Sequence, residues 1–86
     1  MSNNQKPILT IRDGALKASI WENRSDDNKL FHSVTFGRTF TDDAGNAKSA
    51  SSFTGGDILK LSRLAEKAYD RIAEIRLEQS RQTEAA

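Results

Sequence analysis

The residue types that could support catalysis are few and scattered in this chain of 86 residues. His32 is the only histidine and there is no cysteine, so a general base or metal ligand there has no second imidazole or thiolate to work with. Asp26–Asp27 and Asp42–Asp43 are adjacent pairs whose side chains point in different directions, within sequences typical of turns. We therefore expect a structural His32, no metal or other cofactor, and no enzymatic activity.

The segment Thr54-Gly55-Gly56-Asp57 precedes a predicted helix, where backbone amides can bind an anion. It lacks the lysine of a phosphate-binding loop and the glycine spacing of a dinucleotide site. Thr54 and Asp57 have instead the three-residue spacing of a capping box, in which the first residue and the fourth hydrogen-bond each other. This spacing predicts a helix cap.

A different chemistry comes from aromatic and basic side chains at alternating positions of predicted strands. Lys17 and Trp21 share one face of such a strand, and Arg12 shares the corresponding face of the strand before it. If Phe31 lies on the same face, bases could stack on the two rings while cations and hydroxyls meet phosphates. The same face could instead dock a protein or have no binding role, because serine and threonine are also ordinary strand residues.

The strand that must position these groups is the run 30–41. Its even positions are mostly apolar and its odd positions mostly hydroxylated, and this period of two predicts one face toward a core and one toward water. Arg38 falls among the core-facing positions directly after Gly37, a residue type that often marks a bend in a strand. The sequence leaves open whether Arg38 reaches the rim or packs at the edge.

Two shorter strands, 8–12 and 15–22, flank Asp13-Gly14, a pair typical of a two-residue hairpin turn of type I′. That turn predicts the pairs Arg12 with Ala15, Ile11 with Leu16 and Leu9 with Ala18. Directly opposed residues share a face. The prediction therefore places Leu9, Ile11, Leu16, Ala18 and Ile20 on one face, and Thr10, Arg12, Lys17, Ser19 and Trp21 on the other.

The rest of the chain predicts a turn at 42–46, a weak edge strand at 47–53 and a helix from about 58 to 79. We expect an α+β fold in which a curved four-stranded antiparallel sheet (β-β-β-β-α) is covered by one long C-terminal helix. The helix exceeds the sheet in length, so a helix of a second subunit is expected to cover part of its apolar stripe. The predicted homodimer interface consists of Leu61, Ala65, Ala68, Ile72 and Ile75.

The composition of the chain limits which functions and what size of core we can expect. The 13 basic and 12 acidic residues give a net charge of +1, which excludes the bulk basicity of a dedicated nucleic-acid binder. With 36% hydrophobic residues the core must be small, which favours a dimer. There is no apolar leader and no run of apolar residues long enough to span a membrane, so we expect a cytoplasmic protein. The expected organisation is a disordered 1–6, a single domain over 7–79 and a frayed 80–86.

The strand and turn 34–46, within this order of four strands and a helix, resemble the positive-cofactor-four-like transcriptional coactivators. That family binds single-stranded DNA, and the likeness covers about residues 8–76 in topology and spacing. It implies a curved sheet, dimerisation through the helices and binding channels on the strand face. By position, the counterparts of the family's binding surface are Lys17, Trp21, Arg38 and Lys48.

The chain departs from that family at Ser49–Ser52, where a lysine and a glycine are usual, and in having no tryptophan in the helix. Two short stretches of the sequence, residues 16–23 and 64–69, are similar to small uncharacterised proteins carried on bacterial plasmids and integrative elements. This similarity implies no activity. The expected function is single-stranded DNA binding as a transcription or replication accessory factor, with a protein-interaction module as the alternative. The predicted nucleic-acid-binding residues are Arg12, Lys17, Trp21, Phe31, Arg38 and Lys48.

Overall fold

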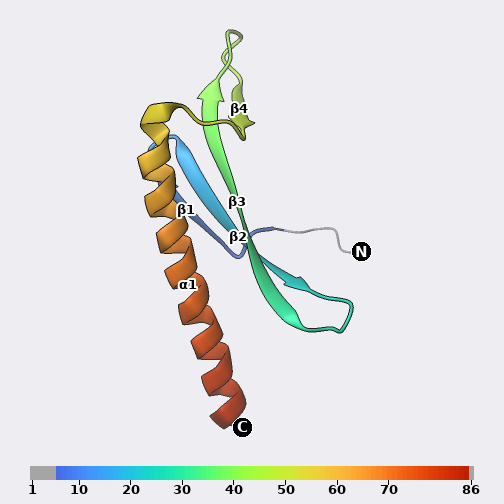
Figure 1. Ribbon diagram of the computed structural model, residues 1–86. Coiled ribbons are helices and arrows are strands. Elements are labelled where there is room, and N and C mark those ends of the chain that lie inside the picture. Colours follow the sequence, from blue (N-terminus) through green and yellow to red (C-terminus); the bar gives the residue numbers. More distant parts are fainter. Residues whose placement is uncertain (1–5, 86) are drawn as a thin grey trace.

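The computed structural model describes residues 6–85, and the side chains of residues 6–81. Four strands form one antiparallel sheet in the order β1-β2-β3-β4, and a long helix follows along one side of it (Figure 1). The predicted α+β class and element order are confirmed. The strands are β1 (Leu9–Asp13), β2 (Leu16–Arg24), β3 (Leu30–Thr41) and β4 (Ala47–Ala50), and the helices are the short 3₁₀ turn η1 (Gly55–Asp57) and α1 (Ile58–Ala85).

The β1–β2 hairpin turns one residue later than its Asp-Gly pair predicts. Its pairs are Asp13 with Leu16, Ile11 with Ala18 and Leu9 with Ile20, so the predicted pairings were wrong. Gly14, at φ +63, is the first of the two loop residues, and the second does not have a positive φ. That is the pattern of a type II′ turn, in which glycine occupies the first central position. The predicted faces still hold, because every pairing is displaced by two residues and the side-chain period is also two.

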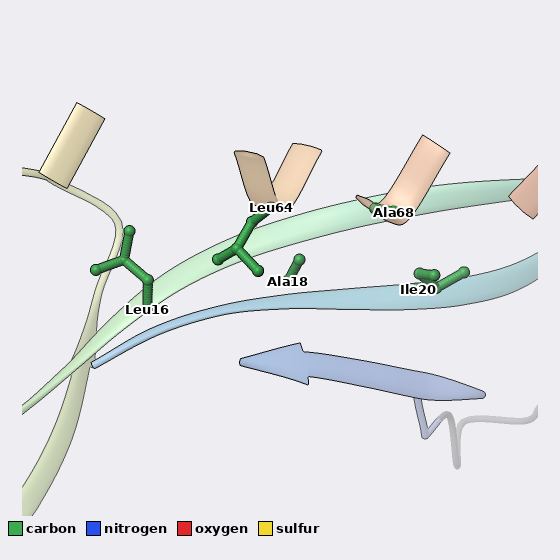
Figure 2. Close-up of a cluster of buried hydrophobic side chains, with 5 residues drawn as sticks. All are labelled: Leu16, Ala18, Ile20, Leu64 and Ala68. Atoms are coloured by element: carbon green, nitrogen blue, oxygen red, sulfur yellow. The ribbon is translucent and has the colours of Figure 1, made fainter. Parts of the chain in front are cut away.

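The core lies between β2 and α1. Leu16, Ala18 and Ile20 point from alternate positions of β2 toward Leu64 and Ala68 of α1, and all five are fully buried (Figure 2). Half-buried apolar residues pack around these five: Leu9, Ile11, Val34, Phe36, Phe53, Leu61 and Ile72. A core of five fully buried residues, two of them alanines, is small, as the composition predicts.

The helix α1 is longer than predicted. It continues to Ala85, past the expected end near Gln79, and the fraying expected over 80–86 stays a prediction. The predicted disorder over 1–6 falls mostly on residues 1–5, which lie outside the described part of the chain, as does residue 86. At the other end of the sheet, β4 stops at Ala50, short of the predicted strand over 47–53.

The apolar stripe assigned to a dimer interface is largely the contact between α1 and the chain's own sheet. Ala68 is fully buried in the core, and Leu61 and Ile72 pack against that core. Ile75 is half-buried on the same side of the helix, whereas Ala65 is exposed. These residues therefore do not form one free stripe, because the monomer already uses most of it. An apolar repeat of three and four residues fits a sheet as well as a second helix.

Candidate nucleic-acid interface

One face of the sheet carries α1 and the other carries no described helix (Figure 1). Strand pairing determines which side chains share the uncovered side, because directly opposed residues lie on the same face. We call this side the open face. Its described members are Thr10, Arg12, Lys17, Ser19, Trp21, Asn23, Phe31, Ser33, Thr35, Gly37, Thr39, Thr41, Ala47 and Ser49.

Trp21 lies on the open face and is held there by a hydrogen bond. Its indole Nε1 donates to Thr35 Oγ1 at 2.8 Å, and Thr35 is diagonal to it across the β2–β3 pairing. Trp21 is half-buried, so part of its ring surface remains accessible. The hydrogen bond satisfies the indole donor and restricts the ring's rotation. The arrangement is a partly preorganised aromatic surface on a rigid pair of strands.

Phe31 supplies a second aromatic ring on the opposite diagonal from Trp21. It is 48% exposed and stands directly opposite Asn23, while Ser33 stands directly opposite Trp21. The amide of Asn23 donates to Ser33 Oγ at 2.9 Å, which links the two cross-strand pairs. Diagonal positions of an antiparallel pair are within reach of large side chains. The two predicted stacking residues therefore share one face and one neighbourhood.

The side chain of Lys17 passes over β3 at Gly37. These two residues are directly opposed, and a Cβ atom at Gly37 would lie 3.3 Å from Lys17 Cε and 3.0 Å from Ser49 Oγ. The glycine thus leaves room for the lysine stem to run across the strand toward β4. The β2–β3 pairing is continuous through Gly37, from Leu16 with Arg38 onward, so the glycine does not mark a bulge. Its effect is to seat Lys17 on the open face.

Arg12 is exposed and stands directly opposite Lys17 across the β1–β2 pairing. Like charges in that position repel each other, a small cost that a bound anion would remove. The two carboxylates of the described strands, Asp13 and Glu22, pair with Leu16 and His32 and so lie on the helix side. Among the described residues the open face therefore carries two cations and no carboxylate.

Arg38 and Lys48 are not brought together with the other four predicted binding residues. Arg38 is opposite Leu16 and Ala50, on the helix side, where its Nε donates to the carbonyl oxygen of Ser52 at 3.0 Å. Its guanidinium also lies 5.7 Å from the ring centre of Phe40. The unbroken alternation of β3 determines this side, because no bend turns Arg38 to the rim.

Lys48 has the same parity as Arg38. It stands opposite Phe40 at the hairpin that projects beyond the start of α1, and its Nζ is 3.7 Å from Asp42 Oδ2. The six predicted binding residues thus divide into Arg12, Lys17, Trp21 and Phe31 on the open face, and Arg38 and Lys48 on the opposite side. The open face has fewer cations than the sequence led us to expect.

Arg38 belongs instead to the entry of the helix. Thr54 donates from its backbone N–H and from its hydroxyl to Asp57 Oδ2, at 3.2 and 2.9 Å, and the predicted capping box is present. The bonds from Thr54 hold the pKa of Asp57 below its usual value, and the positive charges of Arg38 and Lys60 act in the same direction. Arg38 therefore contributes to the segment that joins β4 to α1.

His32 lies on the helix side of the sheet, away from the open face. Its side chain is 2% exposed on the helix side, its Nε2 has no hydrogen-bond partner among the described residues, and Glu22 Oε2 is 3.9 Å away. Over the described part of the chain, no three histidine, cysteine or acidic residues gather as metal ligands would. The geometry gives Nε2 of His32 no access to water, which a base acting on a substrate would need.

Several residues of the open face were not among the predicted binding residues. Thr35 and Gly37 are the partners that hold Trp21 and Lys17, and Asn23 and Ser33 form the neighbouring polar pair. The odd positions of Ser33, Thr35 and Gly37 in β3 were visible in the sequence pattern. So was the position of Trp21 on the outward face of β2. What the pattern lacked was the β2–β3 register, which decides which of these residues meet.

The sequence matches no known family model, and comparisons with curated proteins and with solved structures found no match. Within residues 6–85, no helix is both long and apolar enough to cross a membrane. What the chain binds is therefore inferred first from the chemistry of the open face.

Proposed function

We propose that this chain binds single-stranded nucleic acid, and DNA in particular, on the open face. In this proposal it does not catalyse a reaction. The observation that supports this most is Trp21, whose ring is tethered to Thr35 on the open face, which among the described residues holds two cations and no carboxylate. A preorganised aromatic surface beside basic and hydroxyl groups is what binding to unpaired bases requires. The likeness in topology to the positive-cofactor-four-like coactivators supports the same function, in a cytoplasmic transcription or replication accessory role.

In this proposal the bases stack on Trp21 and Phe31. Stacking of a base on an aromatic side chain contributes about 1–3 kcal/mol and tolerates any base, since every base has a π face. Lys17 and Arg12 contact phosphates, and the hydroxyls of the open face add hydrogen bonds to the backbone. We therefore expect little sequence preference and a preference for single strands over duplex, whose bases are already stacked.

The small number of cations makes the expected salt dependence specific. Two phosphate contacts to a single strand predict a slope of about −1.4 in log K against log salt concentration. Raising the salt from about 50 to about 200 mM should then weaken binding roughly sevenfold. A basic groove of six or more contacts would lose several orders of magnitude over the same range.

The test is a fluorescence-anisotropy titration of labelled oligo-dT at these two salt concentrations, with duplex DNA of equal length for comparison. Lys17→Gln should weaken binding and flatten the salt dependence, whereas Lys48→Gln, on the other side of the sheet, is the matched control and should change neither. No anisotropy change at low salt with micromolar protein would contradict the proposal. A protein-docking role for the same face predicts that outcome, together with partner binding that persists at high salt.

A further inference from the structure

The outer edge of β1 is a free sheet edge with an identifiable set of unpaired groups. Directly before β2, the carbonyl oxygen of Ala15 accepts from Thr39 N, so in β2 the backbone groups of odd residues face β3 and those of even residues face β1. The residues of β1 that pair with those even residues are Leu9, Ile11 and Asp13. Thr10 and Arg12 therefore direct their N–H and C=O groups outward, away from the sheet.

An apolar groove runs beside this edge, between β1 and α1. It has a volume of about 410 Å³ and is lined by Leu9, Thr10 and Ile11 from the strand and by Lys67, Asp70 and Arg71 from the helix. Leu9 and Ile11 lie on the helix side but remain half-exposed, because α1 does not reach over the edge completely. The opposite edge, β4, has the composition Ala-Lys-Ser-Ala and no such groove among those found on the described residues.

We propose that a second copy of this chain occupies the β1 edge, with the two β1 strands pairing antiparallel about a twofold axis at Ile11. Thr10 of each copy then exchanges backbone hydrogen bonds with Arg12 of the other, which uses both outward-facing residues of the strand. An axis at Thr10 is disfavoured because it requires Ile8, whose N–H is already bonded to the carbonyl oxygen of Ile20. Pairing about Ile11 keeps the helix-side residues of both copies on one face.

The charges at the rim of the groove favour a second copy over a foreign peptide. Asp70 lies between the cationic positions Lys67 and Arg71 on the helix flank that borders β1. A twofold axis beside this flank brings the acidic residue of each copy toward the basic residues of the other, so the rim is complementary to itself. A strand from another protein would complement these alternating charges only if its own charges happened to be spaced in the same way.

The extended shape of the single chain also favours a second copy at the β1 edge. Its radius of gyration is 15.7 Å, against about 12 Å expected for a compact domain of 86 residues. Over the part of the chain whose side chains are described, five hydrophobic residues are fully buried, so the isolated chain leaves apolar surface that pairing at β1 would bury. The pairing doubles the four-stranded sheet and places the two helices side by side over Leu9 and Ile11. This inference does not depend on the proposed function.

The first test is the molar mass in solution, measured by sedimentation equilibrium across the micromolar range. Thr10→Pro removes an outward N–H without touching the β1–β2 hydrogen bonds, and edge strands accept proline at such positions. We expect a dimeric wild type, a monomeric Thr10→Pro and a dimeric Thr10→Val control that retains the N–H. A monomeric wild type throughout the range, or a Thr10→Pro variant that dimerises as the wild type does, would overturn the proposal.

The second test reverses charges on the exposed helix flank, where folding is not at risk. Lys67→Glu and Asp70→Lys should each weaken the dimer at least tenfold, and the double variant should restore most of the affinity. Singles without effect, or a double variant weaker than either single, would refute pairing at this edge. Oligo-dT binding measured on Thr10→Pro separates the two proposals, because the monomer keeps all four proposed binding residues of the open face.

Discussion

The indole Nε1 of Trp21 and the hydroxyl of Thr35 are joined by a hydrogen bond of 2.8 Å across the β2–β3 pairing, on the side of the sheet away from the helix. Thr35 is itself exposed, so this bond does not serve the core. It restricts an aromatic ring that could otherwise rotate freely. A ring ordered before its ligand arrives loses less side-chain entropy on binding, which is the advantage of preorganisation.

Replacing Thr35 by valine should weaken oligonucleotide binding while leaving the fold intact. The change removes the hydroxyl that accepts from Trp21 but keeps the shape and the strand preference of the side chain. A hydrogen bond of this kind contributes about 0.5–1.5 kcal/mol, so we expect roughly two- to tenfold weaker binding to oligo-dT. Ser62→Ala, which removes an exposed hydroxyl from α1, is the control. Equal affinity of both variants and wild type would show that the tether does not matter for binding.

Replacing Gly37 by alanine should disturb the seat of Lys17. The new Cβ would crowd Ser49 Oγ at 3.0 Å and Lys17 Cε at 3.3 Å. We expect a loss of about 1 kcal/mol in the free energy of unfolding by urea, and weaker oligonucleotide binding as Lys17 shifts. Adding Ser49→Ala should recover part of the stability. Gly55→Ala is the control, because a Cβ there meets nothing within 4 Å.

Arg38 and Lys17 should separate stability from binding. Arg38→Gln loses the bond to the carbonyl of Ser52 and the contact with Phe40, so the domain should unfold at lower urea concentration. Because Arg38 lies on the helix side, the slope of oligonucleotide binding against salt should stay unchanged. Lys17→Gln should reduce the magnitude of that slope by about 0.7 with little effect on unfolding. A flatter slope for Arg38→Gln would mean that nucleic acid contacts the other face.

The helix cap should make stability depend on acid pH. The hydrogen bonds from Thr54 hold the folded-state pKa of Asp57 below its usual value, so the unfolded chain binds a proton there more readily. This contribution is fully present above about pH 4 and is lost as the pH falls through the lowered folded-state pKa. Asp57→Asn should therefore lower the melting temperature at pH 7, and the difference from wild type should shrink below about pH 4. Asp26→Asn, in an exposed turn, is the control for the loss of one carboxylate.

The alternation of residues 30–41 and of 16–22 was sufficient to predict the sheet, its faces and the core residues Leu16, Ala18 and Ile20. It was not sufficient for the β1–β2 register, because Asp13-Gly14 fits a turn in which Gly14 is either the first or the second central residue. Nor could it place Trp21 against Thr35, since pairing partners across two strands are a tertiary property. Arg38 is instructive here, because its even position indicated the helix side and only the resemblance placed it on the binding surface.

For α1, the sequence predicted the apolar residues of the helix but not the surface that they contact. The spacing of Leu61, Ala68 and Ile72 predicts an apolar stripe, but not whether that stripe meets the chain's own sheet or another subunit. The structure assigns it to the sheet, because β2 presents three small or aliphatic side chains on the facing side. The β1 edge is then left unpaired, and no count of apolar residues along the chain would identify it.

Trp21 is the only tryptophan in the chain, so its fluorescence reports on the open face alone. The most direct test of the proposed function is a titration of the unlabelled protein with oligo-dT at low salt, followed through this emission. Stacking on the open face predicts quenching that saturates at the affinity measured by anisotropy and reverses when salt is added. Binding detected by anisotropy with unchanged tryptophan emission would place the nucleic acid elsewhere and contradict the proposal.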